Sequence, residues 1–211
     1  MLKKIRIVAF ALIPVIVAVN LAIWWLVRQD DPTAAGDATG PLVTNVSVGG
    51  PFTLVDHTGR EVTEESYRGK FRLMYFGYTF CPDVCPTELG NLAVALDELG
   101  EDIDGVVPMF ITIDPERDTP ELLAEYVRLF HDNLIGLTGS RDQVDEVARN
   151  YRVFYRKVKD PDYTYYLMDH TSFTYLMGPD GELVRMFAYG TPPEKIAGAI
   201  RDALRQHDVV G

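Results

Sequence analysis

Two spacings of apolar residues follow one another along the chain from residue 52 onward. Short runs that alternate between apolar and polar positions, or are apolar throughout, are typical of strands. Longer stretches with apolar residues at every third or fourth position are typical of helices. Strands are expected at residues 52–56, 61–63, 71–78, 106–113, 134–137, 153–158, 172–177 and 183–187. Helices are expected at residues 86–99, 120–130, 140–150 and 191–206.

Turn and capping residues support these boundaries. Pro86 suits the first position of a helix, and Gly100 suits its end. Thr119 and Ser140 suit the N-caps of the next two helices. The polar, tyrosine-rich residues 160–169 show neither spacing and are expected to form a connection. The order is strand, cysteine-containing loop, helix, strand and helix, followed by a hairpin and a last helix. This order predicts an α/β domain with a thioredoxin-like fold and a mixed central sheet.

The N-terminal residues follow a different pattern. Residues 7–27 form an apolar run that only Pro14 and Asn20 interrupt. At about 1.5 Å per residue, a helix of this length spans about 30 Å, which matches the core of a bilayer. Basic residues precede the run and two tryptophans stand near its far end, so the N-terminus is expected in the cytoplasm. We therefore expect a single, uncleaved transmembrane helix.

A cleaved signal peptide is the alternative, because residues 33–36 resemble a weak cleavage site. The apolar core of a signal peptide is normally only about 7–15 residues long, however. The chain also lacks an Arg- and Ser-rich leader, which favours the bacterial cytoplasmic (inner) membrane over mitochondrial import. We expect a cytoplasmic N-terminus and transmembrane anchor at residues 1–28 and a flexible tether at residues 29–47. The folded domain, residues 48–211, is then expected on the outer, periplasmic side.

Charge divides the chain near the same place. The 211 residues carry a net charge of −11, yet residues 1–28 contain four basic side chains and no acidic one. The rest of the chain therefore carries −15. Phosphate backbones repel so acidic a domain, which excludes nucleic acid as a partner. The apolar share of 47% supports one folded domain with a core rather than a disordered chain.

The chain contains two cysteines, Cys81 and Cys85, which lie four residues apart. A disulfide between them closes a very small loop and adds little stability through chain entropy. A local disulfide and a pair of free thiols without a function are two possible interpretations. A redox pair or a metal site better explains two cysteines on a strand-to-helix loop. The helix start expected near Cys85 favours a thiolate there. Two thiolates suit Cu(I) and zinc, and an added imidazole also accommodates Cu(II).

His170 is the residue expected to complete such a site. It stands before the apolar strand at residues 172–177, and in a thioredoxin-like fold this position faces the cysteine loop. Thioredoxins usually carry a cis-proline there, whereas this chain has Asp169-His170-Thr171. The difference favours metal binding over general disulfide exchange, with a surface-loop histidine as the alternative. Met168 is interpreted as a packing residue, with weak ligation by its thioether as the alternative.

Other residues near these candidates have two interpretations each. Asp83 is either an outer contact of the site or a turn residue. Arg117 is expected to pair with Asp114 or Asp118, which flank the end of a neighbouring strand, rather than to touch a substrate. Three tyrosines of the expected connection are either a docking surface or a cover over the sheet edge, namely Tyr163, Tyr165 and Tyr166.

Three separated motifs resemble the Sco/SenC family of copper chaperones, and the resemblance covers about residues 45–207. They are Tyr-Phe-Gly-Tyr-Thr-Phe-Cys-Pro-Asp-Val-Cys-Pro-Thr at residues 75–87, Ile-Asp-Pro-Glu-Arg-Asp-Thr at 113–119, and Asp-His-Thr at 169–171 ahead of Gly-Pro-Asp-Gly at 178–181. The resemblance implies that Cys81, Cys85 and His170 ligate one copper ion, as Cu(I), Cu(II) or both. It also implies assembly of the binuclear copper centre of cytochrome c oxidase subunit II. The copper domain of that subunit and an upstream copper donor protein are then partners.

Two functions follow from these residues. The first is a metallochaperone, not primarily an enzyme, that delivers copper and is also able to reduce the cysteines of its target. The alternative is a membrane-tethered thiol–disulfide oxidoreductase without physiological copper. Both use Cys81 and Cys85, which form a redox-active pair in the second case. The two functions differ at His170, because metal transfer requires this residue and disulfide exchange alone does not.

Overall fold

The computed structural model describes residues 20–21, 47–159, 161 and 163–210. The chain divides into two compact units, Met1–Asn45 and Val46–Gly211. In the first unit only Asn20 and Leu21 are described, and both are helical. Almost all of the predicted anchor and of the predicted tether therefore lies outside the described residues. Among the helices that are described, none is long and apolar enough to span a bilayer.

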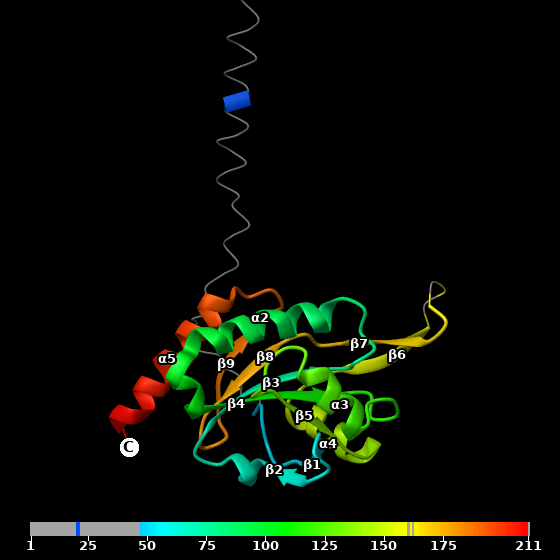
Figure 1. The fold of residues 1–211 in the computed structure, drawn as a ribbon, viewed down its shortest axis with the longest axis horizontal. Coiled ribbons are helices and arrows are strands. Elements are labelled where there is room, and N and C mark those ends of the chain that lie inside the picture. Colours follow the sequence, from blue (N-terminus) through cyan, green and yellow to red (C-terminus); the bar gives the residue numbers. More distant parts are fainter. Residues whose placement is uncertain (1–19, 22–46, 160, 162, 211) are drawn as a thin grey trace, which may run out of the picture. The chain divides into compact units, whose positions relative to one another are not determined.

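The second unit is built around one sheet of seven strands (Figure 1). Named in their order across the sheet, they are β2 (Glu61–Thr63), β1 (Thr53–Asp56), β5 (Ile135–Thr138), β4 (Val106–Thr112), β3 (Phe71–Gly77), β8 (Thr174–Met177) and β9 (Leu183–Phe187). The central strands β3, β4 and β5 are parallel to one another. On either side, β8 pairs antiparallel with β3, and β1 with β5. The sheet is therefore mixed, as predicted.

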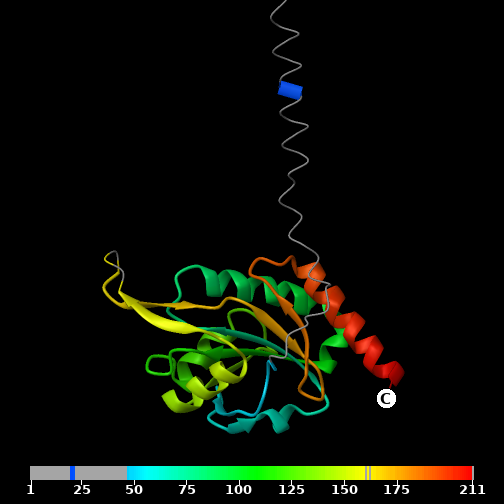
Figure 2. The ribbon, with the colours of Figure 1, turned by 180° about the vertical axis from the view of Figure 1, so that it is seen from behind.

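Helices cover both faces of this sheet (Figures 1 and 2). They are α2 (Val84–Leu99), α3 (Pro120–Val127), α4 (Arg141–Asn150) and α5 (Pro193–Val210), with 3-10 helices at Glu64–Tyr67 and Gly100–Gly105. On one face, the ring of Phe110 in β4 packs on Tyr126 of α3 at a centroid distance of 5.4 Å, and α5 packs on α2. On the other face, Phe76 of β3 packs on Tyr151, which follows α4, at 5.7 Å. This double cover explains why β3 and β4 are buried at every position.

The starts of α3 and α4 follow their capping residues, whereas the start of α2 differs from the prediction. The Thr119 hydroxyl accepts a hydrogen bond from the Leu122 N–H at 3.3 Å, so α3 begins with Pro120 as predicted. The helix that follows the cysteine loop, α2, begins at Val84, so the prediction that Pro86 occupies its first position is wrong. Pro86 is the third residue instead. A proline is tolerated there because the first N–H groups of a helix have no partner within the helix.

A second, two-stranded sheet projects from the domain (Figure 2). It pairs β6 (Tyr155–Lys159) with β7 (Tyr166–His170) and places Tyr155 opposite His170. The prediction of a connection at residues 160–169 is therefore wrong for its second half. The sequence Tyr-Leu-Met-Asp-His of β7 has no regular alternation, and pairing with β6 defines the strand instead. His170 consequently ends a strand of its own rather than a loop.

Candidate metal centre

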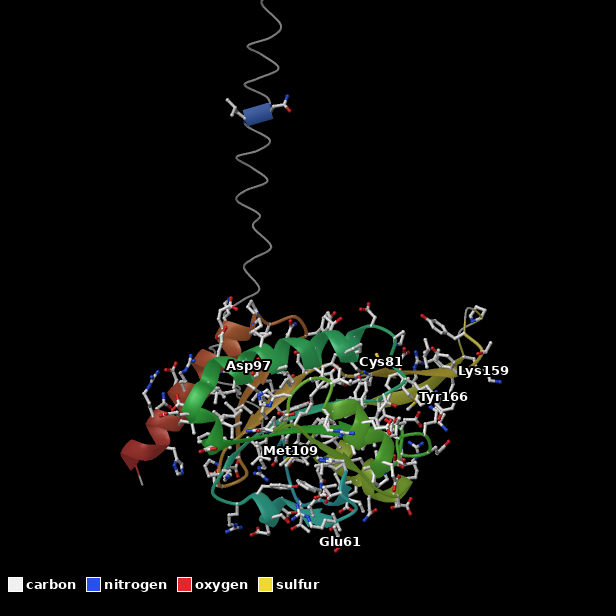
Figure 3. The ribbon with its side chains drawn as sticks, viewed as in Figure 1. Glu61, Cys81, Asp97, Met109, Lys159 and Tyr166 are labelled. Carbon is white, nitrogen blue, oxygen red and sulfur yellow. The ribbon has the colours of Figure 1, made fainter. Side chains whose placement is uncertain are left out.

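The two cysteines lie at the carboxyl end of β3, at the same end of the domain as Tyr166 (Figure 3). Cys85 is the second residue of α2 and is completely buried, whereas Cys81 in the preceding loop is partly exposed. The Cys85 N–H donates a hydrogen bond to Cys81 Sγ at 3.3 Å. Both side chains are free thiols. The start of the helix thus turns its unpaired amides toward the outer sulfur, which favours negative charge on that sulfur.

His170 reaches the same place from the end of β7. Its Nε2 lies 3.5 Å from Cys85 Sγ, and its Nδ1 lies 2.9 Å from the Thr171 carbonyl oxygen. Because a carbonyl oxygen only accepts hydrogen bonds, Nδ1 carries the proton of the neutral ring. The lone pair of Nε2 therefore faces the sulfur. A histidine that ligates a metal is typically held in this way, with its other nitrogen donating to a carbonyl or carboxylate.

Two aromatic rings fix the orientation of the imidazole. Tyr75 and Tyr78 both meet the His170 ring edge-on, with centroid distances of 6.4 Å and 6.0 Å. The Tyr78 hydroxyl also accepts a hydrogen bond from the Met168 N–H at 3.1 Å, which joins β7 to the end of β3. Neither tyrosine is among the residues predicted from the sequence to form the site. Their position in an apolar run directly before the cysteines was the available signal.

The structure brings the three predicted ligand residues together, but their ligand atoms are not arranged as a complete metal site. Within the described ranges, no three His, Cys, Asp or Glu side chains form a group already arranged to hold a metal ion. Instead, the sulfur of Cys85 and the imidazole of His170 contact each other directly. Ligation requires the thiol proton to leave first, because the thiolate is the metal ligand.

The two thiols differ strongly in acidity. A hydrogen bond from the Cys85 thiol is the largest cause that lowers the pKa of Cys81, and it outweighs the opposing effect of burial. The same hydrogen bond, then burial, then the charge on Cys81 raise the pKa of Cys85. The pair therefore shares one proton, with the thiolate on the accessible Cys81. Such an arrangement suits both nucleophilic attack by Cys81 and capture of a soft metal ion.

We expect Cys81 to remain reactive in mildly acidic solution. Its alkylation rate with iodoacetamide is expected to fall less than about threefold from about pH 8 to about pH 6, whereas an ordinary thiol loses roughly 100-fold. The rate is measured by mass spectrometry on the reduced chain. Cys85→Ala removes the hydrogen bond that lowers the pKa of Cys81, so its rate is expected to fall steeply over this range. A wild-type profile like that of an ordinary thiol contradicts the assignment.

The surrounding polar residues have structural partners. Arg117 pairs with buried Asp114 at 2.5 Å. This confirms the prediction that Arg117 pairs with Asp114 or Asp118. Asp118 accepts hydrogen bonds from the Thr79 N–H and hydroxyl at 3.1 Å and 2.6 Å, which holds the cysteine loop two residues before Cys81. Burial raises the pKa of Asp118. Asp118 therefore supports the cysteine loop, whereas Asp114 holds Arg117.

Three further candidates are placed by their exposure and contacts. Met168 is buried in the core, in line with its interpretation as a packing residue. Asp83 is exposed and precedes α2, where its carboxylate accepts a hydrogen bond from the Thr87 hydroxyl at 3.4 Å. The three tyrosines of the predicted connection differ in exposure. The ring of Tyr166 packs over Arg117, whereas Tyr163 and Tyr165 are exposed.

The parallel βαβ core, the cysteine pair at its carboxyl edge and the opposing histidine define a thioredoxin-like protein with a candidate metal site. The chain belongs to the SCO1/SenC family, whose model matches residues 42–205. Protein SCO1 homolog, mitochondrial, of Homo sapiens is 46% identical over 165 residues, which cover 76% of this chain and 54% of that protein. The chain spans about half the length of this curated relative and of Protein SCO1 homolog 1, mitochondrial, of Arabidopsis thaliana.

Solved structures of Sco proteins are also similar to this chain. Arabidopsis thaliana ScoI with copper bound is 43% identical, with a TM-score of 0.71 over 76% of this chain and 99% of that one. BsSco is described as a member of the Sco family of cytochrome c oxidase assembly proteins in which a disulfide switch was identified. It is 27% identical to this chain. Its TM-score is 0.59 over 75% of this chain and 94% of that one. Both similarities cover the described domain and its thioredoxin-like fold.

Proposed function

We propose that this chain is a copper chaperone that holds one copper ion with Cys81, Cys85 and His170 and delivers it to cytochrome c oxidase. The observation that carries the proposal is the 3.5 Å approach of His170 Nε2 to Cys85 Sγ between two residues that are 85 positions apart in sequence. Cys81 Sγ lies beside them and accepts a hydrogen bond from the Cys85 N–H. Two soft sulfurs and an imidazole nitrogen suit Cu(I) and also accept Cu(II).

The relatives support copper as the cargo and the oxidase as its destination. The Arabidopsis relative was solved with copper bound, and BsSco is described as belonging to a family of oxidase assembly proteins. The acceptor we propose is the binuclear copper centre of subunit II, and an upstream donor protein loads the site. The apolar run at residues 7–27 supports a proposed anchor in the bacterial inner membrane, with the domain on the periplasmic side.

Each site residue has a distinct role in this proposal. Cys81 is partly exposed and carries the thiolate, so it meets the incoming ion first. Cys85 then loses its proton and supplies the inner sulfur. His170 presents the Nε2 lone pair, because the Thr171 carbonyl holds the proton on Nδ1. The buried rings of Tyr75 and Tyr78 exclude water from the inner side of the sulfur pair.

The proposal predicts that copper binding depends on the reduced state of the cysteines. The whole chain, purified in detergent and reduced, is expected to bind about one copper ion, because two thiolates and one imidazole form one site. After oxidation to a Cys81–Cys85 disulfide, binding is expected to be lost. The Cu(II) form is expected to show strong thiolate-to-copper absorption that Cys85→Ser alters. Undiminished binding by the disulfide form would refute the proposal.

Thiol–disulfide exchange is a second candidate function with its own supporting observation. The shared proton of the cysteine pair leaves a thiolate on the accessible Cys81, as a redox-active pair requires. Reduction of the target's cysteines would then accompany or replace copper delivery. The two functions separate at His170, which exchange does not need.

A further inference from the structure

Arg117 contacts both the segment directly before Cys81 and the first residue of β7, the strand that ends at His170. It follows β4, and its side chain is only 16% exposed. Its Nε donates to Asp114 Oδ2 at 2.5 Å, and the Asp114 side chain is completely buried. The guanidinium is therefore fixed by a rigid carboxylate at the edge of the central sheet and does not swing freely in solvent.

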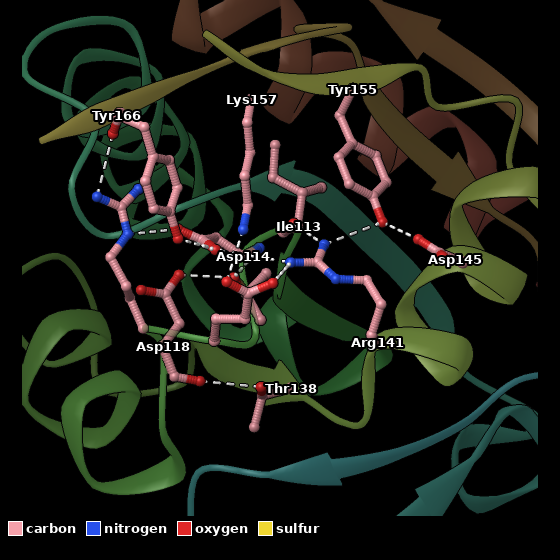
Figure 4. A network of polar contacts seen from close by, with 12 residues as sticks. Ile113, Asp114, Asp118, Thr138, Arg141, Asp145, Tyr155, Lys157 and Tyr166 are labelled. Carbon is pink, nitrogen blue, oxygen red and sulfur yellow. Dashed lines mark hydrogen bonds and ion pairs between the residues drawn. The ribbon is translucent and has the colours of Figure 1, made fainter. Parts of the chain in front are cut away.

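One side of this guanidinium holds the strand that carries His170. Arg117 Nη1 donates to the Tyr166 carbonyl oxygen at 3.1 Å, and the guanidinium carbon lies 3.8 Å from the centroid of the Tyr166 ring. The Tyr166 hydroxyl in turn donates to Asp114 Oδ1 at 2.8 Å (Figure 4). Tyr166 is the first residue of β7 and His170 is the last. The beginning of the histidine strand is thus tied to the end of β4.

The cysteine loop contacts the same guanidinium. The guanidinium carbon lies 4.5 Å from the centroid of the Phe80 ring and 5.8 Å from that of Tyr78. Phe80 directly precedes Cys81. It is 41% exposed, so burial in the core does not hold it in place. Arg117 therefore contacts residues adjoining the outer sulfur on one side and the histidine strand on the other.

Neighbouring cations contact the hairpin without reaching the cysteine loop. Lys157 pairs with Glu116 at 2.6 Å and lies 4.6 Å from the Tyr166 ring centroid. Arg156 pairs with Asp169 at 2.8 Å within the hairpin. In the part of the chain that the structure describes, Arg117 alone has cation–ring contacts with both Phe80 and Tyr166.

From these contacts we infer that Arg117 is a positioning residue that holds the histidine-bearing hairpin against the cysteine loop and so sets the approach of His170 to the thiols. The inference rests on the proposed copper function, since it concerns the same three ligands. Arginine suits this role because its planar guanidinium stacks on aromatic rings while its N–H groups bind a carboxylate and a carbonyl. Lysine offers a point charge and cannot make both kinds of contact together.

The test compares Arg117→Gln with the wild type and with Arg156→Gln as a matched control. Copper affinity of the reduced whole chain is measured by competition with a chromophoric chelator. Arg117→Gln is expected to bind copper about 10–100-fold more weakly, as is usual when an outer support of a metal ligand is lost. Arg117→Lys is expected to fall between the two. Arg156→Gln also loses an ion pair to β7, next to His170, but is expected to change affinity less than about twofold.

A double-mutant cycle shows how Arg117 acts. If Arg117 works through His170, Arg117→Gln has little further effect in a chain that already carries His170→Ala. The metal-free protein gives a second measurement, amide hydrogen exchange, which is expected to rise at residues 166–170 but not in β3 or β4. If Arg117→Gln fails to fold, Phe80→Ala removes the closer of the two ring contacts of Arg117 on the cysteine side, together with the packing of Phe80 against Tyr165, and is expected to weaken copper binding in the same direction.

Two results would overturn the inference. One is unchanged copper affinity in Arg117→Gln, or in Phe80→Ala where that variant replaces it. The other is an equal loss of affinity with and without His170, which would show that Arg117 does not act through the histidine. Failure of the proposed function is visible separately, because His170→Ala alone would then leave copper binding unchanged.

Discussion

Replacing His170 with alanine is expected to weaken copper binding by the reduced chain by at least about 100-fold, while thiol–disulfide exchange changes only slightly. Loss of an outer support typically costs about 10–100-fold in metal affinity, and His170→Ala removes a proposed ligand itself. Only Cys81 and Cys85 then remain to hold the ion. Exchange needs only these two sulfurs, so its rate constant is expected to stay within about threefold of the wild type.

The measurement pairs chelator competition for copper with the rate of reduction of a small disulfide substrate. His131→Ala is the matched control, because His131 lies beyond the end of α3 and interacts with Asp97 at 3.5 Å near the far end of α2. This control is expected to leave both quantities unchanged. Equal copper affinity in His170→Ala and wild type would remove the basis for copper delivery and favour thiol exchange as the function.

Replacing Gly77 with alanine is expected to damage both the fold and the site. A Cβ atom at this position would lie 2.8 Å from Phe110 Cε2, 2.9 Å from Cys85 Sγ and 3.2 Å from Tyr75 Cε1. All three groups are completely buried, so none has free space to enter. Overpacking of this kind costs about 1–3 kcal/mol of unfolding free energy. The displaced sulfur is also expected to weaken copper binding.

Urea denaturation of the reduced chain measures the loss of stability, and the chelator assay measures the site. Gly90→Ala is the control, because nothing lies within 4 Å of a Cβ atom at that helical position. Alanine there is expected to be neutral or to stabilise by up to about 1 kcal/mol. A Gly77→Ala chain as stable as the wild type and with intact copper affinity would show that the core yields at little cost.

Much of the fold could be predicted because strong local signals agree with the tertiary structure. The runs that form β3 and β4 are apolar throughout because helices cover both faces of the sheet. Thr119 and Ser140 mark helix starts because their hydroxyls accept hydrogen bonds from N–H groups of the first turn. The strand β7 was missed because it is defined by its pairing with β6, which leaves no periodic pattern in the sequence.

The candidate site was predictable to a similar degree. Cys81, Cys85 and His170 have side chains suited to soft metals, and the structure places them side by side. The supporting residues were harder to predict because their roles depend on contacts across the fold. The ring of Tyr75 packs against the imidazole of His170, and Gly77 leaves room for a sulfur from the next element. Neither contact follows from sequence spacing.

The unequal exposure of the two sulfurs has a consequence for the order of ligand exchange. Cys85 is completely buried, whereas Cys81 and His170 both reach the surface. Under the proposed function, an acceptor's ligands must therefore displace the outer sulfur or the imidazole before they reach the inner sulfur. The bond between copper and the Cys85 sulfur is therefore the last one to break. The ion leaves in a fixed order, from the buried sulfur toward the surface of the donor.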